Sequence, residues 1–314
     1  MWTTESDGSA AKAESLHLAE RLTAEIVAAG LIPDQQVWPS IRERVKRHGA
    51  DEWYRLASYR LSSVEPASAQ KLLGAGYVLT QFLTAPVNTE NSGRNAIYSA
   101  GALINLAVVV CDRLLDGGAS VQEVLPGPGS EVRSPVYVLM ERYRETIAGM
   151  SGHEQPGNKL EKAIARMFDA EVETVHYGMS LPYRFWLRKS ALPFVLMGST
   201  AWLLNKGETR AAFSRHLKWL YEVGRFFGAL DDVVDYADDI ENTAANILRG
   251  HEEGARTALV KRMAKRAVRV LDEWDSVVPR ITGFAVMRES FLFFIWSWLA
   301  KADVQADAQQ WQAS

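Results

Sequence analysis

Five aspartates fall within positions 231 to 239, in the stretch "FFGALDDVVDYADD" (226–239). Each helical residue turns about 100°, so Asp231, Asp235 and Asp239, which are spaced four apart, share one face of a helix. Carboxylates at this spacing repel one another and destabilise a helix by about 0.2–0.5 kcal/mol per pair. A divalent cation removes that repulsion, and Mg²⁺ prefers carboxylate oxygens together with phosphates and water. The stretch therefore indicates a magnesium site.

A second pair of acids has the same spacing. In "YSAGALINLAVVVCDRLLDGG" (98–118), Asp112 and Asp116 are four apart, and small or apolar residues precede them on the same face. Glycines lie upstream of both acid groups, Gly101 before the first and Gly224 and Gly228 before the second. We interpret these glycines as room for a bulky ligand. The alternatives are a solvated acidic face for 231–239 and a helix-end pair near bulk water for 112–116.

The acids require helices to position them, and helical periodicity dominates the chain, with no alternating strand segments or fixed repeats. We predict one all-α domain over residues 1–314, with residues 1–9 and 304–314 frayed because they are polar. Gly- and Pro-rich loops at 125–135 and 151–158 separate apolar helices and are not linkers. The predicted helices span 10–29, 38–48, 51–63, 67–85, 94–117, 134–149, 158–178, 182–205, 208–240, 255–277 and 281–303.

Composition narrows the class of protein. A net charge of -3 argues against a general nucleic-acid binder. The single cysteine, Cys111, excludes an internal disulfide and a four-cysteine zinc site and is typical of a reducing cytoplasm. The longest uncharged stretch, 95–111, is shorter than the roughly 20 residues of a membrane-spanning helix and includes Asn105. The first residues resemble no secretory signal, so we expect a soluble cytoplasmic protein.

Three segments resemble a known family, the trans-prenyl diphosphate synthases and the class I terpene synthases that share their fold. "FFGALDDVVD" resembles the second aspartate-rich motif, which carries over Asp231, Asp232 and Asp235. It is also similar to the terpene-synthase metal triad, on which the metal ligands are Asp231, Asp235 and Asp239. "DRLLD" (112–116) resembles the first motif, with Arg113 in place of its second aspartate. "RKSALPF" (188–194) resembles the segment whose lysine, here Lys189, binds the departing diphosphate.

The resemblance implies a fold, a cofactor and a reaction. The fold is the isoprenoid synthase fold, about ten helices around a central apolar cavity. The cofactor is Mg²⁺, three ions held by the two acid groups. Lys189, Arg184 and Arg188 would bind the diphosphate of a prenyl diphosphate, whose ionisation leaves a carbocation in a dry pocket. The residues expected to line that pocket are Tyr98, Asn105, Val108, Phe194, Phe227, Phe293 and Trp296.

Departures from the family favour one activity within it. Chain-elongating synthases bind a second diphosphate with cations before and after the first acidic motif. Here Arg94 is the one cation of "NSGRNAIY" (91–98), and no arginine follows Asp116 until Arg133. We therefore predict a terpene synthase that cyclises or quenches one prenyl diphosphate. Small Ala107 and Val108 before the first motif favour fifteen or twenty carbons.

Other activities and assemblies stay open. The alternative enzyme is a prenyltransferase, or a chain-elongating synthase with an altered acceptor site. A regulatory subunit of a prenyl synthase would have lost its motif aspartates, which this chain retains. A ferritin-like two-metal protein would use the Glu-x-x-His pairs at 14–17 and 173–176, but no inward glutamates accompany them. The resemblance is also compatible with a homodimer.

Overall fold

The computed structural model describes residues 5–59, 61, 64–87, 93–126, 133–151, 158–203, 209–242, 244–278, 280 and 283–312. Within these ranges the chain is helical, with connecting turns and no β-strand. The predicted all-α class is therefore confirmed. The helices are α1 (Glu5–Ala28), α2 (Trp38–Leu56), α3 (Pro66–Thr84), α4 (Arg94–Asp116), α5 (Val121–Val124), α6 (Pro135–Ser151), α7 (Asn158–Tyr177), α8 (Tyr183–Ser199), α9 (Arg210–Val234), α10 (Tyr236–Glu241), α11 (Glu253–Val277) and α12 (Phe284–Gln312).

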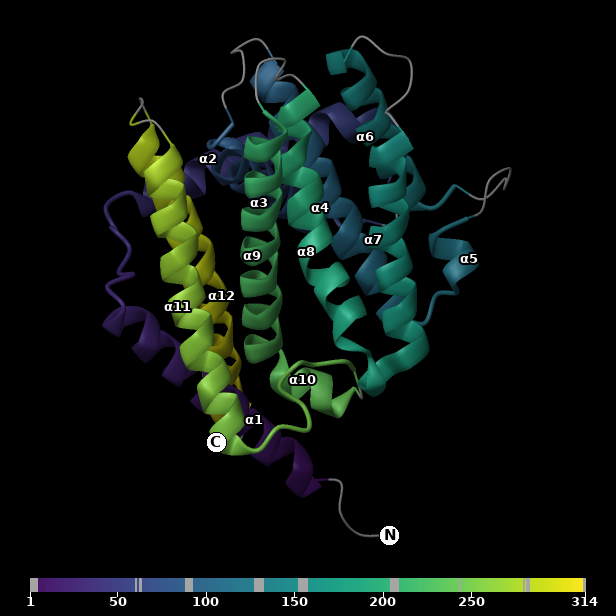
Figure 1. The fold of residues 1–314 in the computed structure, drawn as a ribbon. Helices are drawn as coiled ribbons and strands as arrows, with labels where there is room; N and C mark the ends of the chain where they lie inside the picture. Colours follow the sequence, from purple (N-terminus) through teal and green to yellow (C-terminus); the bar gives the residue numbers. More distant parts are fainter. Residues whose placement is uncertain are drawn as a thin grey trace.

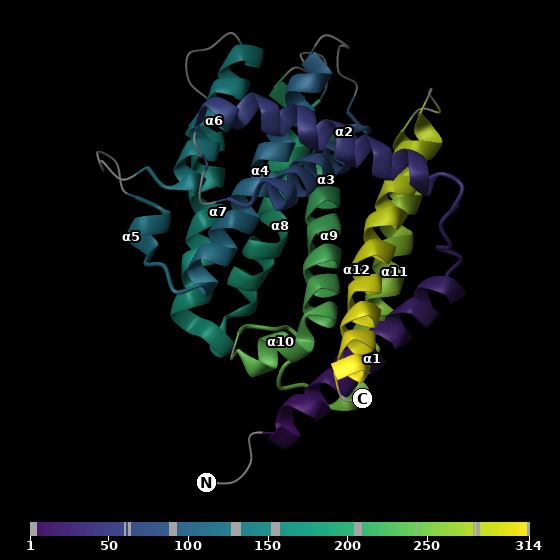
Figure 2. The ribbon, with the colours of Figure 1, turned by 180° about the vertical axis from the view of Figure 1, so that it is seen from behind.

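The helices form a bundle whose long members run roughly along one direction (Figure 1). α9 lies at its centre, with α8 and α7 on one side and α11 and α12 on the other. α2 crosses one end of the bundle, α1 crosses the other, and the short α10 lies at the same end as α1 (Figure 2). α4, which holds the first acid pair, packs against α3, α6 and α8.

Local chemistry explains where several helices begin and end. The Glu65 carboxylate accepts hydrogen bonds from the backbone N–H groups of Ala67 and Ser68, and Pro66 occupies the first turn of α3. The Thr209 hydroxyl accepts from the Ala212 N–H at the start of α9. α4 ends at two glycines, of which Gly118 has φ 84°, a value that favours glycine.

One apolar core runs through the bundle. Most buried hydrophobic residues from α1 to α12 form one contiguous cluster, and a small second cluster consists of Val87, Ile97 and Ala201. At its centre the Phe82 ring stacks on Trp274 and on Phe291, with centroids 5.1 and 5.0 Å apart, and the Trp274 indole donates to the Phe82 carbonyl. α4 is long and apolar enough to cross a membrane by composition, but 61% of its most apolar window is buried inside the bundle.

Two predicted helix boundaries are wrong. Two helices were predicted at 38–48 and 51–63, but Trp38–Leu56 form one helix, α2, followed by a short 3₁₀ turn at Ala57–Tyr59. Gly49 lies inside that helix and marks close packing, since a Cβ there would be 2.0 Å from the Gln70 carbonyl oxygen of α3. The predicted helix 208–240 is interrupted at Asp235, which separates α9 from α10. Residues 5–9 and 304–312 have helical backbone and belong to α1 and α12; that these ends fray stays a prediction.

The predicted role of the glycines is also wrong. A Cβ on Gly101 would lie 1.9 Å from the Thr80 hydroxyl of α3. A Cβ on Gly224 would lie 2.5 Å from the Cα of Ala191 in α8, and one on Gly228 would lie 2.2 Å from the Ser190 hydroxyl. The glycines therefore let neighbouring helices approach closely and do not leave room for a ligand.

Candidate functional site

The first acid group lies at the carboxyl end of α4, where a lysine of α8 meets it. The Lys189 ammonium is 2.6 Å from the Asp112 carboxylate and 3.5 Å from the Glu171 carboxylate of α7. Burial acts to lower the pKa of Lys189, but the charges of Glu171 and Asp112 outweigh it and hold that pKa well above its ordinary value. Lys189 is therefore protonated and forms ion pairs with two acids.

The second acid group lies where α9 passes into α10. Asp231 is in the last turn of α9, Asp235 is at the junction and Asp239 is in α10. The Asp235 N–H donates to the Asp231 carbonyl (2.8 Å) and the Asp239 N–H donates to the Asp235 carbonyl (2.9 Å). The four-residue steps therefore survive the interruption of the helix, and the predicted face remains continuous.

The charges at the end of α4 affect the pKa values of the second acid group. Burial is the largest cause that raises the pKa of Asp231 and of Asp239. For both carboxylates, Lys189 also lowers the pKa and Asp112 also raises it. Such effects require charges that lie near one another, because surface charges more than about 10 Å apart are largely screened. The acids of α4 and of α9 and α10 therefore lie near enough for their charges to interact, and their binding of one ligand stays a prediction.

Burial, with like charges as a smaller cause, raises the pKa values of the second group. Burial, and then the charge of Asp231, raises the pKa of Asp235 to about 7. Burial raises the pKa of Asp239 to about 6. Asp231 is itself exposed to solvent, yet burial raises its pKa. The side chain of Asp231 is exposed and those of Asp235 and Asp239 are half-buried, so the three carboxylates form one acidic surface.

Asp232 does not join this surface. Its side chain is buried, and its Oδ2 accepts hydrogen bonds from the Trp186 indole and from the Ile247 backbone N–H, both at 2.8 Å. Asn246 donates to the Asp232 carbonyl and to the Asp239 carboxylate. Asp232, predicted as a metal ligand, instead ties α9 to α8 and to the segment after α10.

Aromatic rings adjoin the second acid group. The Phe194 and Phe227 rings stack with centroids 5.2 Å apart, and Phe227 lies 5.8 Å from Trp298 of α12. The Trp298 indole donates to the Asp231 carboxylate (2.9 Å). The Lys301 ammonium lies 4.6 Å from the centroid of the Trp298 ring, and its charge lowers the pKa of Asp231 and Asp235. These rings could line a dry pocket beside the acids.

The other residues predicted to line the pocket have their contacts away from the second acid group. Trp296 is two residues from Trp298, about 200° around α12, and donates to the Leu31 carbonyl. Phe293 packs against Trp38. Tyr98 packs against Tyr77 and lies fourteen residues before Asp112, about 20 Å along the helix. Asn105 donates to the Leu72 carbonyl, while Val108 is half-buried one turn before Asp112.

The predicted arginines do not join the acids. Arg184 and Arg188 are exposed, and their guanidinium groups lie 4.8 and 5.6 Å from the centroid of the Phe185 ring. Arg94 is at the start of α4, about 27 Å along the axis from Asp112, so it could not have bound a second diphosphate there. Arg113 donates to the Ser68 hydroxyl of α3. The charge of Lys301 lowers the pKa of Asp231 and Asp235, and the charge of Lys189 lowers that of Asp231 and Asp239.

Several residues that form or support this site were not predicted from the sequence. They come from four separate segments and are Glu171, Trp186, Asn246, Trp298 and Lys301. None belongs to a motif. Asn246 is the residue that the sequence could best have indicated. It is the polar residue of an otherwise apolar "AANIL" (244–248), a pattern that suggests a buried hydrogen bond.

The carboxylates of the two acid groups fit a hard cation such as Mg²⁺, which fills the rest of its coordination shell with ligand phosphates and water. Among the described residues, no group of three or more histidine, cysteine, aspartate or glutamate side chains converges as a complete metal site. Mg²⁺ commonly takes one or two carboxylates and fills its shell with substrate phosphates and water. Asp112 with Asp116, and Asp231 with Asp235 and Asp239, supply carboxylates of that kind on two sides of one surface.

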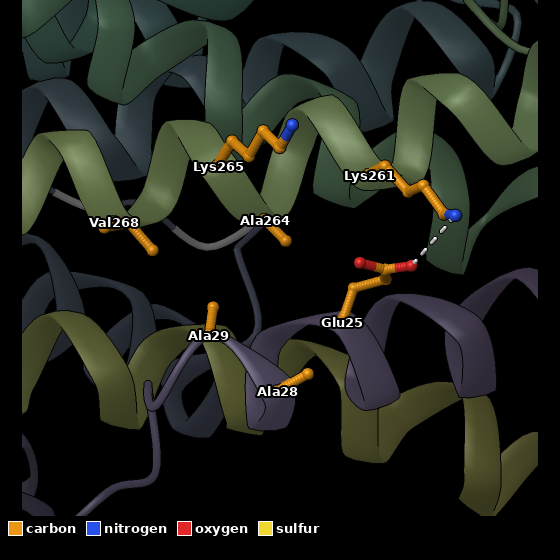
Figure 3. A pocket seen from close by; sticks show the side chains of 7 residues that line it. All are labelled: Glu25, Ala28, Ala29, Lys261, Ala264, Lys265 and Val268. Atoms are coloured by element: carbon orange, nitrogen blue, oxygen red, sulfur yellow. Dashed lines mark ion pairs between the residues drawn. The ribbon is translucent and has the colours of Figure 1, made fainter.

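A separate hollow lies away from these acids. It is a groove between α1 and α11, lined by seven residues that include Glu25, Lys261 and Lys265 (Figure 3). The Lys261 ammonium is 3.8 Å from the Glu25 carboxylate. The remaining lining is alanine and valine, so the groove offers little chemistry of its own.

Comparison with known proteins shows a structural likeness to solved structures. No protein-family model and no curated protein matches this chain. Among solved structures, a polyprenyl synthase from Caulobacter crescentus CB15, described as complexed with calcium and isoprenyl diphosphate, is similar at 15% identity. The match covers 90% of this chain and 97% of that chain, with a TM-score of 0.43.

Proposed function

We propose that this protein is a class I terpene synthase that ionises one linear prenyl diphosphate with Mg²⁺ and cyclises or quenches the cation. The observation that supports this is the meeting of two acid groups and Lys189 on one surface beside aromatic rings. The substrate we propose has fifteen or twenty carbons. We further propose that the chain folds as a single domain and acts in the cytoplasm. Assembly of two copies into a homodimer is compatible with this proposal.

The acids and Lys189 would act on the diphosphate of the substrate, and the aromatic residues on its hydrocarbon tail. Asp112, Asp116, Asp231, Asp235 and Asp239 would hold Mg²⁺, whose charge neutralises the diphosphate and makes it a better leaving group. Lys189 would turn from Asp112 to donate hydrogen bonds to the diphosphate oxygens, since charge-assisted bonds of this kind are strong. Asp232 would keep α9 in place and would bind no metal.

The aromatic residues would act on the cation. Phe194, Phe227 and Trp298 adjoin the second acid group, and an aromatic face stabilises a cation by about 0.5–2 kcal/mol. They would also exclude water, which would otherwise quench an allylic cation at once. Phe227 is buried, whereas Phe194 and Trp298 are half-buried, so the tail would enter where the last two can move.

The test is turnover without an acceptor. We expect the purified protein with Mg²⁺ to release pyrophosphate from a fifteen- or twenty-carbon diphosphate and to give a hydrocarbon or alcohol by mass spectrometry. Ten- and twenty-five-carbon diphosphates complete the series. Asp112→Asn and Asp231→Asn should each abolish the product. Full turnover in both variants, or no pyrophosphate from any of the four diphosphates, would refute the proposal.

A prenyltransferase is the second candidate, because Lys301 places another cation beside the second acid group. Such an enzyme could hold an anionic acceptor there. Pyrophosphate release that requires an added acceptor, such as isopentenyl diphosphate, would favour this activity over the cyclase.

A further inference from the structure

Glu171 is a buried acid that no motif accounts for. It lies in α7, its side chain is 1% exposed, and its Oε1 has no hydrogen-bond partner. A buried polar group without a partner costs about 1–3 kcal/mol. Its other oxygen, Oε2, is 3.5 Å from the Lys189 ammonium. The carboxylate therefore has one weak contact, and that contact is with the lysine of the acid site.

Lys189 stands between two acids at unequal distances. Its ammonium is 2.6 Å from Asp112 and 3.5 Å from Glu171. An ammonium bonded to Asp112 competes with a metal ion for the same carboxylate. If Lys189 leaves Asp112, Glu171 is the anion already within reach, and its unpartnered oxygen lets the carboxylate turn toward the ammonium.

We propose that Glu171 is a positioning residue that draws Lys189 away from Asp112 when a metal–diphosphate ligand binds. This inference rests on the proposed function, because it assigns Lys189 to the diphosphate and Asp112 to the metal. Glu171 itself touches neither ligand. Its effect is on the Mg²⁺ concentration at which the site accepts a diphosphate.

The test measures binding and needs no turnover. Inorganic pyrophosphate is titrated into the full-length protein by calorimetry at a series of Mg²⁺ concentrations. Glu171→Gln keeps the shape and removes the charge, so Lys189 stays with Asp112. We expect the Mg²⁺ concentration for half-maximal binding to rise about tenfold, the lower end of the loss typical for partners of metal ligands.

A double-mutant cycle shows whether Glu171 acts through Lys189. In a Lys189→Gln background, Glu171→Gln should add no further loss, because the cation that it positions is gone. Glu173→Gln, on the same helix about 200° away, is the matched control and should bind as the wild type does. Should Glu171→Gln fail to fold, Glu171→Asp keeps the charge with a shorter reach and should show a smaller rise in the Mg²⁺ requirement.

The outcomes separate the two proposals. Wild-type protein that binds no pyrophosphate with Mg²⁺ would refute the proposed function and this inference with it. Wild-type binding with an unchanged Mg²⁺ requirement in Glu171→Gln, or in Glu171→Asp where that is the folded variant, would refute the inference alone. Losses that simply add in the double variant would show a general charge effect and would also overturn it.

Discussion

At the residue scale, two adjacent aspartates have different roles. Asp231 and Asp232 are separated by about 100° around α9, so one side chain faces the acid surface and the other faces the core. Asp231 is exposed and accepts from Trp298, whereas Asp232 is buried and accepts from Trp186 and the Ile247 backbone. We therefore expect Asp231 to contribute to ligand binding and Asp232 to contribute to folding.

Alanine variants of the two aspartates should affect different properties. Asp232→Ala should lower stability, and Asp231→Ala should lower ligand binding. Asp232→Ala leaves two buried donors unpaired, at about 1–3 kcal/mol each, so we expect a loss of about 2–6 kcal/mol in the free energy of unfolding. Asp231→Ala should lose Mg²⁺-dependent pyrophosphate binding, and because Asp231 is exposed its stability should change by less than about 1 kcal/mol. Urea denaturation and calorimetry measure the two effects. Equal stability losses would contradict the assignment of Asp232.

At the scale of elements, the site depends on how closely α8 approaches α9. Gly224 and Gly228 of α9 meet the backbone and side chains of Ser190 and Ala191, which follow Lys189 directly. This contact holds Lys189 of α8 at a set distance from the acids that end α9. A larger residue at either glycine would separate the two helices.

Gly224→Ala should therefore destabilise the protein although alanine favours helices. Its Cβ would lie 2.5 Å from the Ala191 Cα, a backbone atom that cannot move alone. Overpacking of this kind costs about 1–3 kcal/mol, and we expect a loss in that range in thermal or urea unfolding. Gly149→Ala in α6 is the control, because its Cβ would meet nothing within 4 Å. It should be unchanged or more stable by up to about 1 kcal/mol, and an equal loss in both variants would refute the packing argument.

At the scale of the whole molecule, the acid groups oppose folding. In the unfolded chain an aspartate has a pKa of about 3.9, whereas in the folded protein burial and the charge of Asp231 raise the pKa of Asp235 to about 7. Between these two values the folded state holds a proton that the unfolded state has lost. The contribution of Asp235 to stability is thus present at low pH and is lost as pH rises from about 4 to about 7.

Asp235→Asn removes this titration, so we expect pH-dependent stabilisation. In chelator-treated protein at pH 8, the variant should exceed the wild type by about 1–2 kcal/mol in the free energy of unfolding, a value reduced for solvent screening. Near pH 4.5 the two proteins should be nearly equal. Asp272→Asn, at an exposed position on α11, should show no such pH-dependent difference. A variant that is less stable than the wild type at pH 8 would contradict the argument.

The sequence by itself determined the class of fold and the spacing of the acids. The helix predicted at 94–117 is observed as α4, and the one at 255–277 as α11, each within two residues. The four-residue steps of Asp112, Asp116, Asp231, Asp235 and Asp239 persist, even across the interruption between α9 and α10. These features depend on local periodicity and on helix ends, which neighbouring residues in the chain control.

The tertiary structure alone decided which side chains meet. Periodicity assigns a residue to one face of a helix but does not say which helix that face will contact. For this reason the glycines proved to be contacts with α3 and α8, Trp298 adjoins the acids where Trp296 was expected, and Arg184 and Arg188 lie over Phe185. Glu171 lies beside Lys189 because α7 packs on α8, a contact between segments that no spacing within either helix specifies.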